Sequence, residues 1–309
     1  MSEEITNGTS EAESRPAALA RSDLTRVAKL PLSPRATAMP AIPDGASRKR
    51  ATRRGQSPDD DTLAGLVPVD GPIPRTDDAA LGEAKRDERG QVTMDVLRRD
   101  PLVQAFIKRA DAQLGVLGYT EHGFRHTSLV AHIAHNVLQR LGYPERTCEL
   151  AAIAGLLHDI GNTVNRRDHA TVGALMAKDL LLGQGMDADE VAAVMGAIGN
   201  HEESTGEPVG EISAALNIAD KSDVHRSRVR ETDPMKFDIH DRVNYASQHS
   251  FVRVEPEAKR IDLEVNIDTS IAPLMDYFEI FLNRMIFIRR AVQFLGCEFR
   301  LTINRNRIL

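Results

Sequence analysis

The spacing of apolar residues changes once along this chain of 309 residues. Over 93–232 they recur three and four positions apart, which is the period of an amphipathic helix. Over 233–309 they alternate with polar residues in short runs, which is the period of a strand, and one helical run interrupts them. The pattern predicts a mainly α protein, with a helical bundle in 93–232 and a small α+β region in 233–309 that packs on the bundle.

Both parts can be divided into expected elements. After a first helical run that begins near residue 93, the bundle is expected to contain helices at 127–141, 145–160, 168–183, 187–200 and 209–230. The α+β region is expected to form a three-stranded antiparallel sheet, packed on a long helix over 273–295, from strands at 252–254, 261–267 and 299–303. Pro256-Glu-Ala-Lys predicts a hairpin turn between the first two strands. Four residues of the long helix are expected in the core, with a homodimer face as the alternative: Phe278, Phe281, Met285 and Ile288.

Residues 1–92 have a different composition. Their first 90 positions hold nine of the fifteen prolines, and no aromatic residue precedes Phe106. Such a segment buries too little apolar surface to offset its ordering entropy, so we expect a disordered tail. It contains a basic cluster, which is either solvated or in weak contact with nucleic acid or a partner: Arg48, Lys49, Arg50, Arg53 and Arg54.

Charge and hydropathy exclude several classes of protein. The formal net charge is −6, which is not the balance of a nucleic-acid binder. No run of eighteen apolar residues is present, so no membrane-spanning helix is expected. The first residues lack the pattern of a secretory signal, and two isolated cysteines suggest reduced thiols. We therefore expect a cytoplasmic protein.

The stretch AGLLHDIGN, residues 154–162, ends an apolar helical run on two polar residues, His158 and Asp159. A carboxylate at the C-terminal end of a helix meets the negative end of its dipole, and a buried unpaired carboxylate costs more still. A positive group is therefore expected nearby, and Gly161 is expected to end the helix in a left-handed conformation. Taken alone, the pair is more typical of a salt bridge at a helix end than of a metal site. A second pair, His240-Asp241, follows no apolar helix and is expected at the surface.

Other polar residues occupy similar places near the first pair. Seven of the ten histidines fall between residues 122 and 201. His126 and His169 each begin a helical run, and His201 ends one. Asp220 follows the apolar stretch ISAALNIA, again a costly place for a carboxylate. These residues favour a metal centre built by facing helices.

The order of these residues resembles the HD-domain superfamily, whose ligands follow the order H…HD…D. The phrases LLHDIGN and IADKSD carry the resemblance, which spans roughly residues 120–225. His169 in DHATVGA and His201 in NHEE resemble the additional histidines of the binuclear subgroups, which include the HD-GYP phosphodiesterases. The chain departs from HD-GYP at Asn162, where a lysine is common, and at Glu202, where a histidine is found; TGEPVG replaces the GYP triplet.

The resemblance implies a site for one or two divalent ions. One ion is assigned to His126, His158, Asp159 and Asp220, and a second to His169 and His201 with Asp159 as a bridge. Glu202 is expected to be a further ligand or a hydrogen-bond partner. Imidazole and carboxylate ligands suit manganese, iron, cobalt, nickel or zinc.

A phosphate-binding site also needs cations. Arg125 adjoins His126, Arg166 and Arg167 follow the His-Asp pair, and Lys221 adjoins Asp220. The arginines are expected to bind substrate, and Asp159 and Lys221 are expected to be catalytic. A further two residues, Arg226 and Arg230, are expected to share a helix face at i, i+4. Each of these cations has an alternative interpretation as an exposed surface charge.

The resemblance implies hydrolysis of a phosphomonoester or phosphodiester in a small, nucleotide-like substrate by metal-activated hydroxide. Two alternatives remain open. Mixed-valent di-iron oxygenases on the same fold use an H…HD…H…H…D set that these six residues also satisfy. A non-catalytic module that binds a nucleotide to regulate a partner would also retain a metal site.

Overall fold

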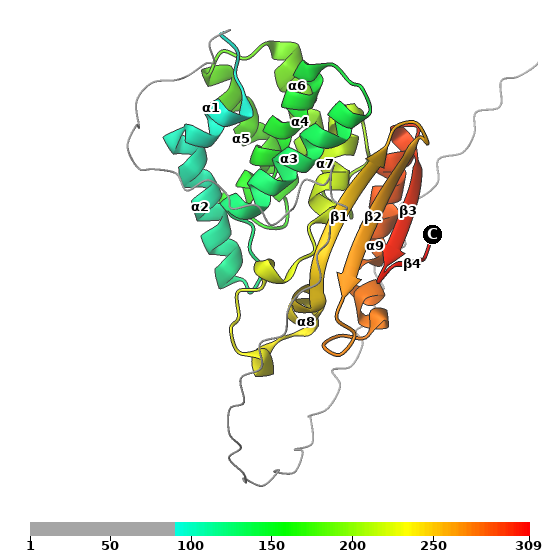
Figure 1. Ribbon diagram of the computed structural model, residues 1–309. Coiled ribbons are helices and arrows are strands. Elements are labelled where there is room, and N and C mark those ends of the chain that lie inside the picture. Colours follow the sequence, from blue (N-terminus) through cyan, green and yellow to red (C-terminus); the bar gives the residue numbers. More distant parts are fainter. Residues whose placement is uncertain (1–89) are drawn as a thin grey trace, which may run out of the picture. The chain divides into compact units, whose positions relative to one another are not determined.

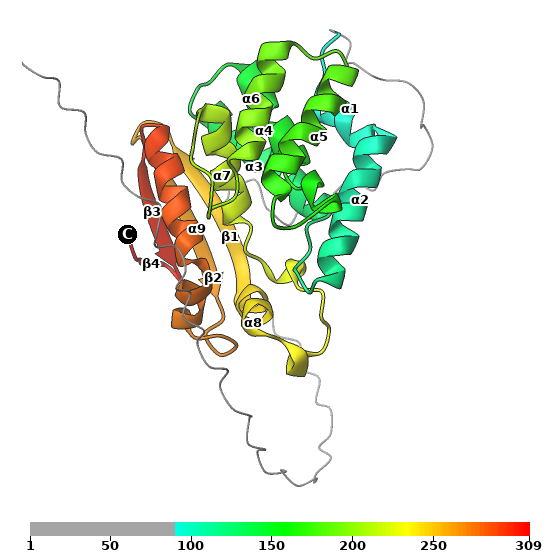
Figure 2. The same ribbon diagram turned by 180° about the vertical axis from the view of Figure 1, so that it is seen from behind.

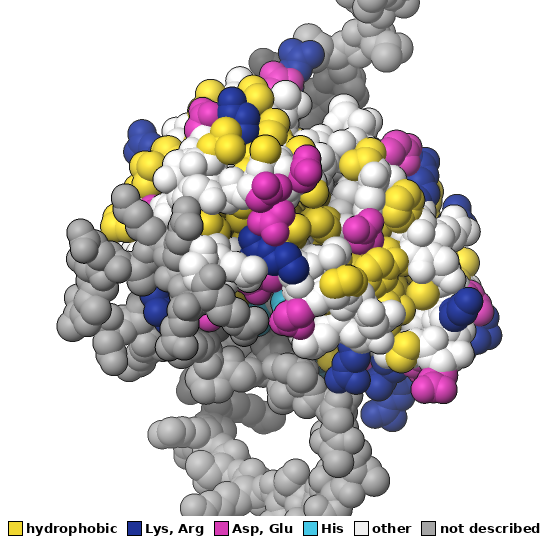
Figure 3. All heavy atoms as spheres, turned by 90° about the horizontal axis from the view of Figure 1, so that it is seen from above, with side chains coloured by type: hydrophobic (Ala, Val, Ile, Leu, Met, Phe, Trp, Pro, Cys, Tyr) yellow, Lys and Arg dark blue, Asp and Glu magenta, His cyan; other side chains and the backbone are white. Residues whose placement is uncertain are grey.

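The computed structural model describes residues 90–309. The predicted tail, apart from residues 90–92, and its basic cluster lie outside the described residues. Within residues 90–309, no helix has the length and hydropathy needed to cross a membrane. The face drawn in Figure 3 carries acidic and basic side chains next to one another, with a histidine visible among them.

Seven α-helices form the first part of the described structure (Figure 1). They are α1 (Met94–Arg99), α2 (Pro101–Val116), α3 (Phe124–Arg140), α4 (Glu145–Leu157), α5 (His169–Gly183), α6 (Ala188–Gly199) and α7 (Glu211–Ser222). A short 3-10 helix, η1 (Ile160–Thr163), follows α4. The predicted bundle and four of its predicted helices, α3 to α6, are confirmed within a few residues at each end.

Helix α4 runs through the core of this bundle. Every residue from 150 to 162 is buried, because this stretch is apolar on all sides of the helix until His158. Neighbouring helices begin at well-defined caps: Asp100 accepts hydrogen bonds from the backbone of Leu102 and Val103 at the start of α2, and Asp187 caps α6. Because residues 150–162 are buried throughout, the end of α4 with His158 and Asp159 lies inside the bundle.

The predicted helix over 209–230 is wrong in its second half. Helix α7 ends at Ser222, and Asp223 leaves the helical conformation with φ −78° and ψ 81°. Arg226 lies in a separate 3-10 helix, η2 (Arg226–Arg228), over the ring of Tyr245, and Arg230 pairs with Asp111. These two arginines therefore share no helix face, because the buried Asp223 turns the chain away from the axis of α7.

The expected left-handed conformation of Gly161 is also wrong, because this glycine is absent from the described glycines with positive φ. The position instead requires a glycine because η1 lies against the start of α5. A Cβ atom on Gly161 would lie 2.0 Å from the carbonyl oxygen of His169 and 2.5 Å from the backbone nitrogen of Gly173. This close approach joins the end of α4 to the first turn of α5.

The second part contains α8 (Ile239–Ala246), which carries the exposed His240, and then the sheet and its helix. The sheet has the order β1-β2-β3-β4, with β1 (Ser247–Glu255), β2 (Arg260–Ile267), β3 (Glu298–Ile303) and β4 (Asn306–Arg307). Strands β1 and β2 form the predicted antiparallel hairpin, with Val254 opposite Ile261.

The expectation of three antiparallel strands needs correction, since the sheet has four strands and is mixed. Strands β2 and β3 are parallel, with Leu263 opposite Leu301, and β3 pairs antiparallel with the two-residue β4. Helix α9 (Leu274–Phe294) lies between β2 and β3 in the sequence and returns the chain to the end where β2 began. A strand that follows such a crossover runs parallel to the one before it.

Helix α9 covers one face of the sheet and lies beside α7 (Figure 2). Phe281, Met285 and Ile288 are buried and Phe278 is partly buried, which confirms the predicted core stripe. The C-terminal part therefore packs against the bundle through α9, next to the helix that carries Asp220.

Candidate metal centre

Six buried side chains from five helical elements meet in the bundle. They are His126 of α3, His158 and Asp159 at the end of α4, His169 at the start of α5, His201 just after α6, and Asp220 near the end of α7. Ligand atoms of two triplets lie within 4.8 Å of one another: His126, His158 and Asp220, and His158, Asp159 and His201. The structure thus brings together all six residues that the sequence predicts as ligands.

The carboxylate of Asp159 lies between two sets of histidines. Its Oδ2 is 3.2 Å from His158 Nε2 and 3.7 Å from His126 Nε2. Its Oδ1 is 3.7 Å from His169 Nε2 and 3.8 Å from His201 Nε2. We call the residues on the Oδ2 side, with Asp220, the first ligand group, and the two histidines on the Oδ1 side the second ligand group.

The first ligand group is closed by Asp220. Asp220 Oδ1 is 3.4 Å from His126 Nε2 and 3.7 Å from His158 Nε2, and these two Nε2 atoms are 3.3 Å apart. In the second ligand group, the Nε2 atoms of His169 and His201 are 3.0 Å apart. The first group therefore presents two imidazole nitrogens and carboxylate oxygens to a common point, and the second presents two imidazole nitrogens beside Asp159 Oδ1.

The Nδ1 atoms, which do not face Asp159, fix the orientation of three of the histidine rings. The Nδ1 atoms of His158, His169 and His201 donate hydrogen bonds of 2.7–2.9 Å to carbonyl oxygens three residues earlier. A carbonyl oxygen can only accept, so Nδ1 carries the hydrogen and Nε2 of a neutral ring offers a lone pair. This is how metal-ligating histidines are usually held.

The charges of the site fit a cation. Burial alone would lower the pKa of His158, but Asp159 and Asp220 beside it raise the pKa above its usual value. Burial would raise the pKa of Asp159, yet His158 holds that pKa well below its usual value. In the first ligand group, two carboxylates thus favour a positive charge at His158 Nε2. Either a proton or a metal ion can provide that charge.

The second ligand group is suited to a metal in another way. Burial lowers the pKa of His169 to about 4, and burial with the neighbouring His158 holds the pKa of His201 well below its usual value. Both rings are therefore neutral near pH 7, which is the form that binds metals. Glu202 Oε2 lies 3.6 Å from His169 Nε2 and can add a carboxylate to this group.

His126 is supported by a buried charge network. Its Nδ1 lies 2.7 Å from Asp223 Oδ2, which also accepts a hydrogen bond of 2.9 Å from Arg125. The buried Arg228 donates to the Asp223 carbonyl at 2.7 Å. Burial would raise the pKa of Asp223, but Arg228, His126 and Arg125 hold it well below its usual value. Arg228 was not predicted, because it lies outside every motif of the sequence.

Lys221 is buried beside Asp220 and forms a second network. Its Nζ lies 2.7 Å from Asp220 Oδ2 and 2.7 Å from Glu203 Oε2. Burial would lower the pKa of Lys221, but Asp220 and Glu203 raise it. Burial would raise the pKa of Glu203, but Lys221 and Arg284 lower it to about 2. Glu203 was not predicted, although its position two residues after His201 is a signal that could have found it.

The other predicted cations lie in different surroundings. Arg166 Nη1 is 3.1 Å from His169 Nε2, its Nη2 is 3.4 Å from Glu202, and its side chain is 31% exposed over the ring of Tyr119. Arg125 binds Glu121 as well as Asp223. The side chain of Arg167 is exposed, and its backbone nitrogen donates to Asn165. Of the three arginines, Arg166 and Arg125 are therefore placed against the site.

Asn162 occupies the place of the lysine that is common in the HD-GYP subgroup. Its side-chain amide donates to the Asp159 carbonyl at 3.0 Å and to Asp159 Oδ1 at 2.9 Å. This buried pair of hydrogen bonds fixes the rotation of the Asp159 carboxylate. The departure from the subgroup thus orients the residue that separates the two ligand groups.

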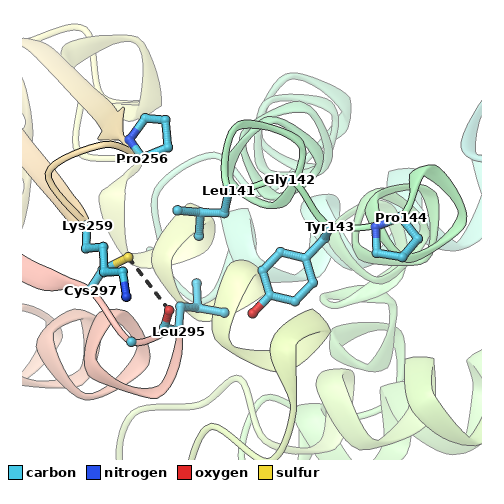
Figure 4. Close-up of a pocket in the computed structure, with 9 residues that line it drawn as sticks. Leu141, Gly142, Tyr143, Pro144, Pro256, Lys259, Leu295 and Cys297 are labelled. Carbon is cyan, nitrogen blue, oxygen red and sulfur yellow. Dashed lines mark hydrogen bonds between the residues drawn. The ribbon is translucent and has the colours of Figure 1, made fainter.

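A hollow of about 370 Å³ lies elsewhere, and none of the six converging residues lines it. Its walls come from the turn between α3 and α4, the β1–β2 hairpin and the turn before β3 (Figure 4). Leu141, Pro144 and Leu295 are among its apolar lining residues, with the ammonium group of Lys259 at one side. This hollow is separate from the candidate metal centre.

Comparison with known proteins agrees with the geometry. Residues 123–227 match the family model described as HD domain. An uncharacterized protein of Methanocaldococcus jannaschii, MJ1020, is 29% identical over 194 residues, which cover 55% of this chain and 74% of that protein. A crystal structure of a predicted HD superfamily hydrolase from an uncultured Thermotogales bacterium shares 29% identity, with coverage of 40% of this chain and 67% of that chain and a TM-score of 0.33.

The matched residues contain all six converging side chains, from His126 to Asp220. The ligand order and the family model thus identify the same part of the chain. Residues 123–227 therefore match an HD domain in sequence, and they contain the six side chains that converge in the bundle.

Proposed function

We propose that this protein is a metal-dependent phosphohydrolase that cleaves a phosphomonoester or phosphodiester of a small, nucleotide-like substrate. The observation that carries the proposal is the two-sided Asp159, whose oxygens face different pairs of histidines. A carboxylate in this position can bridge two ions. The HD domain over residues 123–227 and the description of a solved relative as a predicted hydrolase support the same reaction class.

We assign one ion to each ligand group. His126, His158, Asp159 Oδ2 and Asp220 Oδ1 would hold the first ion, and His169, His201 and Asp159 Oδ1 the second, with Glu202 as an additional ligand. Manganese, iron, cobalt, nickel and zinc all accept this set of nitrogen and oxygen ligands. When bound, a pair of such ions supplies Lewis acidity and activates water for displacement at phosphorus.

The surrounding residues divide the remaining tasks. Asn162 fixes the Asp159 carboxylate, and Lys221 neutralises the oxygen of Asp220 that faces away from the histidines. Arg166 is partly exposed next to the second ligand group, where its guanidinium can bind phosphate oxygens in pairs. Arg125 is held by two carboxylates, so we assign it to the orientation of Asp223 and His126.

The test is phosphate release from a panel of nucleotides and generic phosphoesters, with the metal content measured in the same samples. Asp159→Ala should lose both metal and activity. Asp241→Ala is the matched control, because Asp241 belongs to the second His-Asp pair, which lies in α8 and not among the six converging residues, and the substitution should leave both unchanged. Full metal content and full activity in Asp159→Ala would contradict the proposal.

The same six residues also suit a mixed-valent di-iron oxygenase, and the metal and oxygen requirements separate the two reactions. A phosphohydrolase should release phosphate with manganese in the absence of oxygen. Activity that requires iron and oxygen, together with the spectrum of a mixed-valent pair, would favour the oxygenase instead. Tight nucleotide binding without turnover under either condition would favour a regulatory module.

A further inference from the structure

A row of four alternating charges runs from the first ligand group to the C-terminal helix. Asp220 presents Oδ1 to His126 and His158 and Oδ2 to Lys221. Lys221 Nζ is shared between Asp220 and Glu203, at 2.7 Å from each. Each member of the row therefore constrains the next one.

The row ends outside the HD domain. Glu203 uses Oε2 for Lys221, and its Oε1 lies 3.6 Å from Nε of Arg284. Arg284 belongs to α9, beyond the matched residues 123–227. Its guanidinium lies 4.9 Å above the ring of the buried Phe281, which restricts the rotamers that Arg284 can adopt.

We propose that Arg284 is a positioning residue of the metal centre, which acts through Glu203 and Lys221 on the carboxylate of Asp220. The inference rests on the proposed metal centre and adds that the C-terminal region completes it. Without Arg284, Glu203 keeps a single ionic partner and can move within its loop together with Lys221. The oxygen that Asp220 presents to the histidines is then less well fixed.

The same helix offers a matched control. Arg290 of α9 lies 2.8 Å from Glu207, in the same loop between α6 and α7 that contains Glu203. This pair is 48% and 62% exposed, against 26% and 21% for Arg284 and Glu203. Exposed ion pairs contribute little, and Glu207 has no ion pair with Lys221. Arg290→Gln therefore removes a link between α9 and the loop without breaking the row.

The experiment is a titration of metal-free full-length protein with Co²⁺, followed by its visible absorption, which reports both affinity and coordination. Partners of metal ligands are worth about 10- to 100-fold in affinity, so Arg284→Gln, which acts through two residues, should weaken binding about tenfold and alter the spectrum. Arg284→Lys keeps the charge and should recover part of the affinity. Arg290→Gln should bind within about twofold of the wild type.

A double-mutant cycle tests the route. If Arg284 acts through Glu203, Arg284→Gln should have no further effect on Co²⁺ binding in a Glu203→Gln background. Unchanged affinity and spectrum in Arg284→Gln, equal losses in Arg284→Gln and Arg290→Gln, or full additivity with Glu203→Gln would each overturn the inference. If Arg284→Gln does not fold, Arg284→Lys and its cycle with Glu203→Gln decide in the same way.

The outcomes for the wild type separate this inference from the proposed function. A wild-type protein that binds Co²⁺ but hydrolyses no phosphoester contradicts the phosphohydrolase and leaves the role of Arg284 to the titration. A wild-type protein that binds no Co²⁺ contradicts both.

Discussion

His126 and His169 both direct Nε2 toward Asp159, but their Nδ1 atoms have different partners. His126 lies against the carboxylate of Asp223, which is also held by Arg125, 98 positions earlier, and by Arg228, five positions later. His169 donates to a neutral carbonyl of its own turn, that of Arg166. A carboxylate partner makes an imidazole a stronger ligand than a carbonyl does. We therefore propose that the first ligand group binds the tighter ion and the second the weaker one.

The largest expected effect on activity comes from disrupting the second ligand group while the first stays intact. His201→Gln should lose the second ion and keep the first, because His201 is not among the first ligand group. Since a hydrogen-bond partner of a ligand is already worth about 10- to 100-fold, loss of the ligand itself should lower activity by about 100-fold or more. Metal analysis of His201→Gln should give one ion per chain, and a metal-free variant would contradict the comparison.

The close contact between η1 and the first turn of α5 should not tolerate a larger side chain at Gly161. In Gly161→Ala the added Cβ would lie 2.0 Å from the His169 carbonyl, so α5 must move away from the end of α4. Overpacking of this kind costs about 1–3 kcal/mol in the free energy of unfolding. The control is Gly183→Ala, where no atom lies within 4 Å and which should change stability by no more than about 1 kcal/mol. Urea denaturation of both variants measures the free energy of unfolding, and equal values for the two variants would contradict the close contact at Gly161.

Arg166 should serve substrate on the side of the second group. A hydrogen bond to a charged group contributes about 1.5–3 kcal/mol, so Arg166→Gln should raise KM about tenfold or more. Arg167→Gln, which changes the exposed neighbour, should leave KM near that of the wild type. Steady-state kinetics on the best substrate distinguishes them, and a larger effect at Arg167 would reverse the assignment.

The two groups should also respond differently to acid in the metal-free protein. An unfolded histidine titrates near 6.5, whereas burial lowers the pKa of His169 to about 4. Below pH 6.5 the unfolded state thus binds more protons, so stability falls as pH falls from about 6.5 to about 4. His158 acts in the opposite sense near pH 6.5, because Asp159 and Asp220 raise its pKa against the effect of burial and the folded state binds its proton before the unfolded state does.

The loss due to His169 is about 1 kcal/mol between pH 6.5 and 5.5. Urea denaturation of the metal-free protein at several pH values measures it. His169→Gln should show a shallower dependence on pH than the wild type, and an identical dependence would contradict the neutral state of His169.

The convergence of the six residues was predictable because each occupies a place where local rules fail. Asp159 and Asp220 lie where an apolar helix normally carries no carboxylate, and the histidines begin or follow helices. The change of period likewise predicted the bundle and the hairpin. These signals are local, and the structure agrees with them.

The misses depend on contacts between distant residues. Asp223 breaks α7 because its carboxylate is bound by Arg125, 98 positions earlier, so periodicity alone extended the helix too far. Gly161 is set by the approach of α5 rather than by its own φ. Glu203 and Arg284 lie 81 positions apart, and no spacing rule joins a loop residue to the C-terminal helix.

The central claim is that Asp159 separates two ion sites, and the number and coupling of bound Mn²⁺ ions test it most directly. Isothermal titration with electron paramagnetic resonance should find two ions per chain that are spin-coupled, as expected for a separation of about 3.5–4 Å. Asp159→Ala should abolish the coupled signal, while Asp241→Ala keeps it. One ion per chain, or two uncoupled ions in the wild type, would contradict the account.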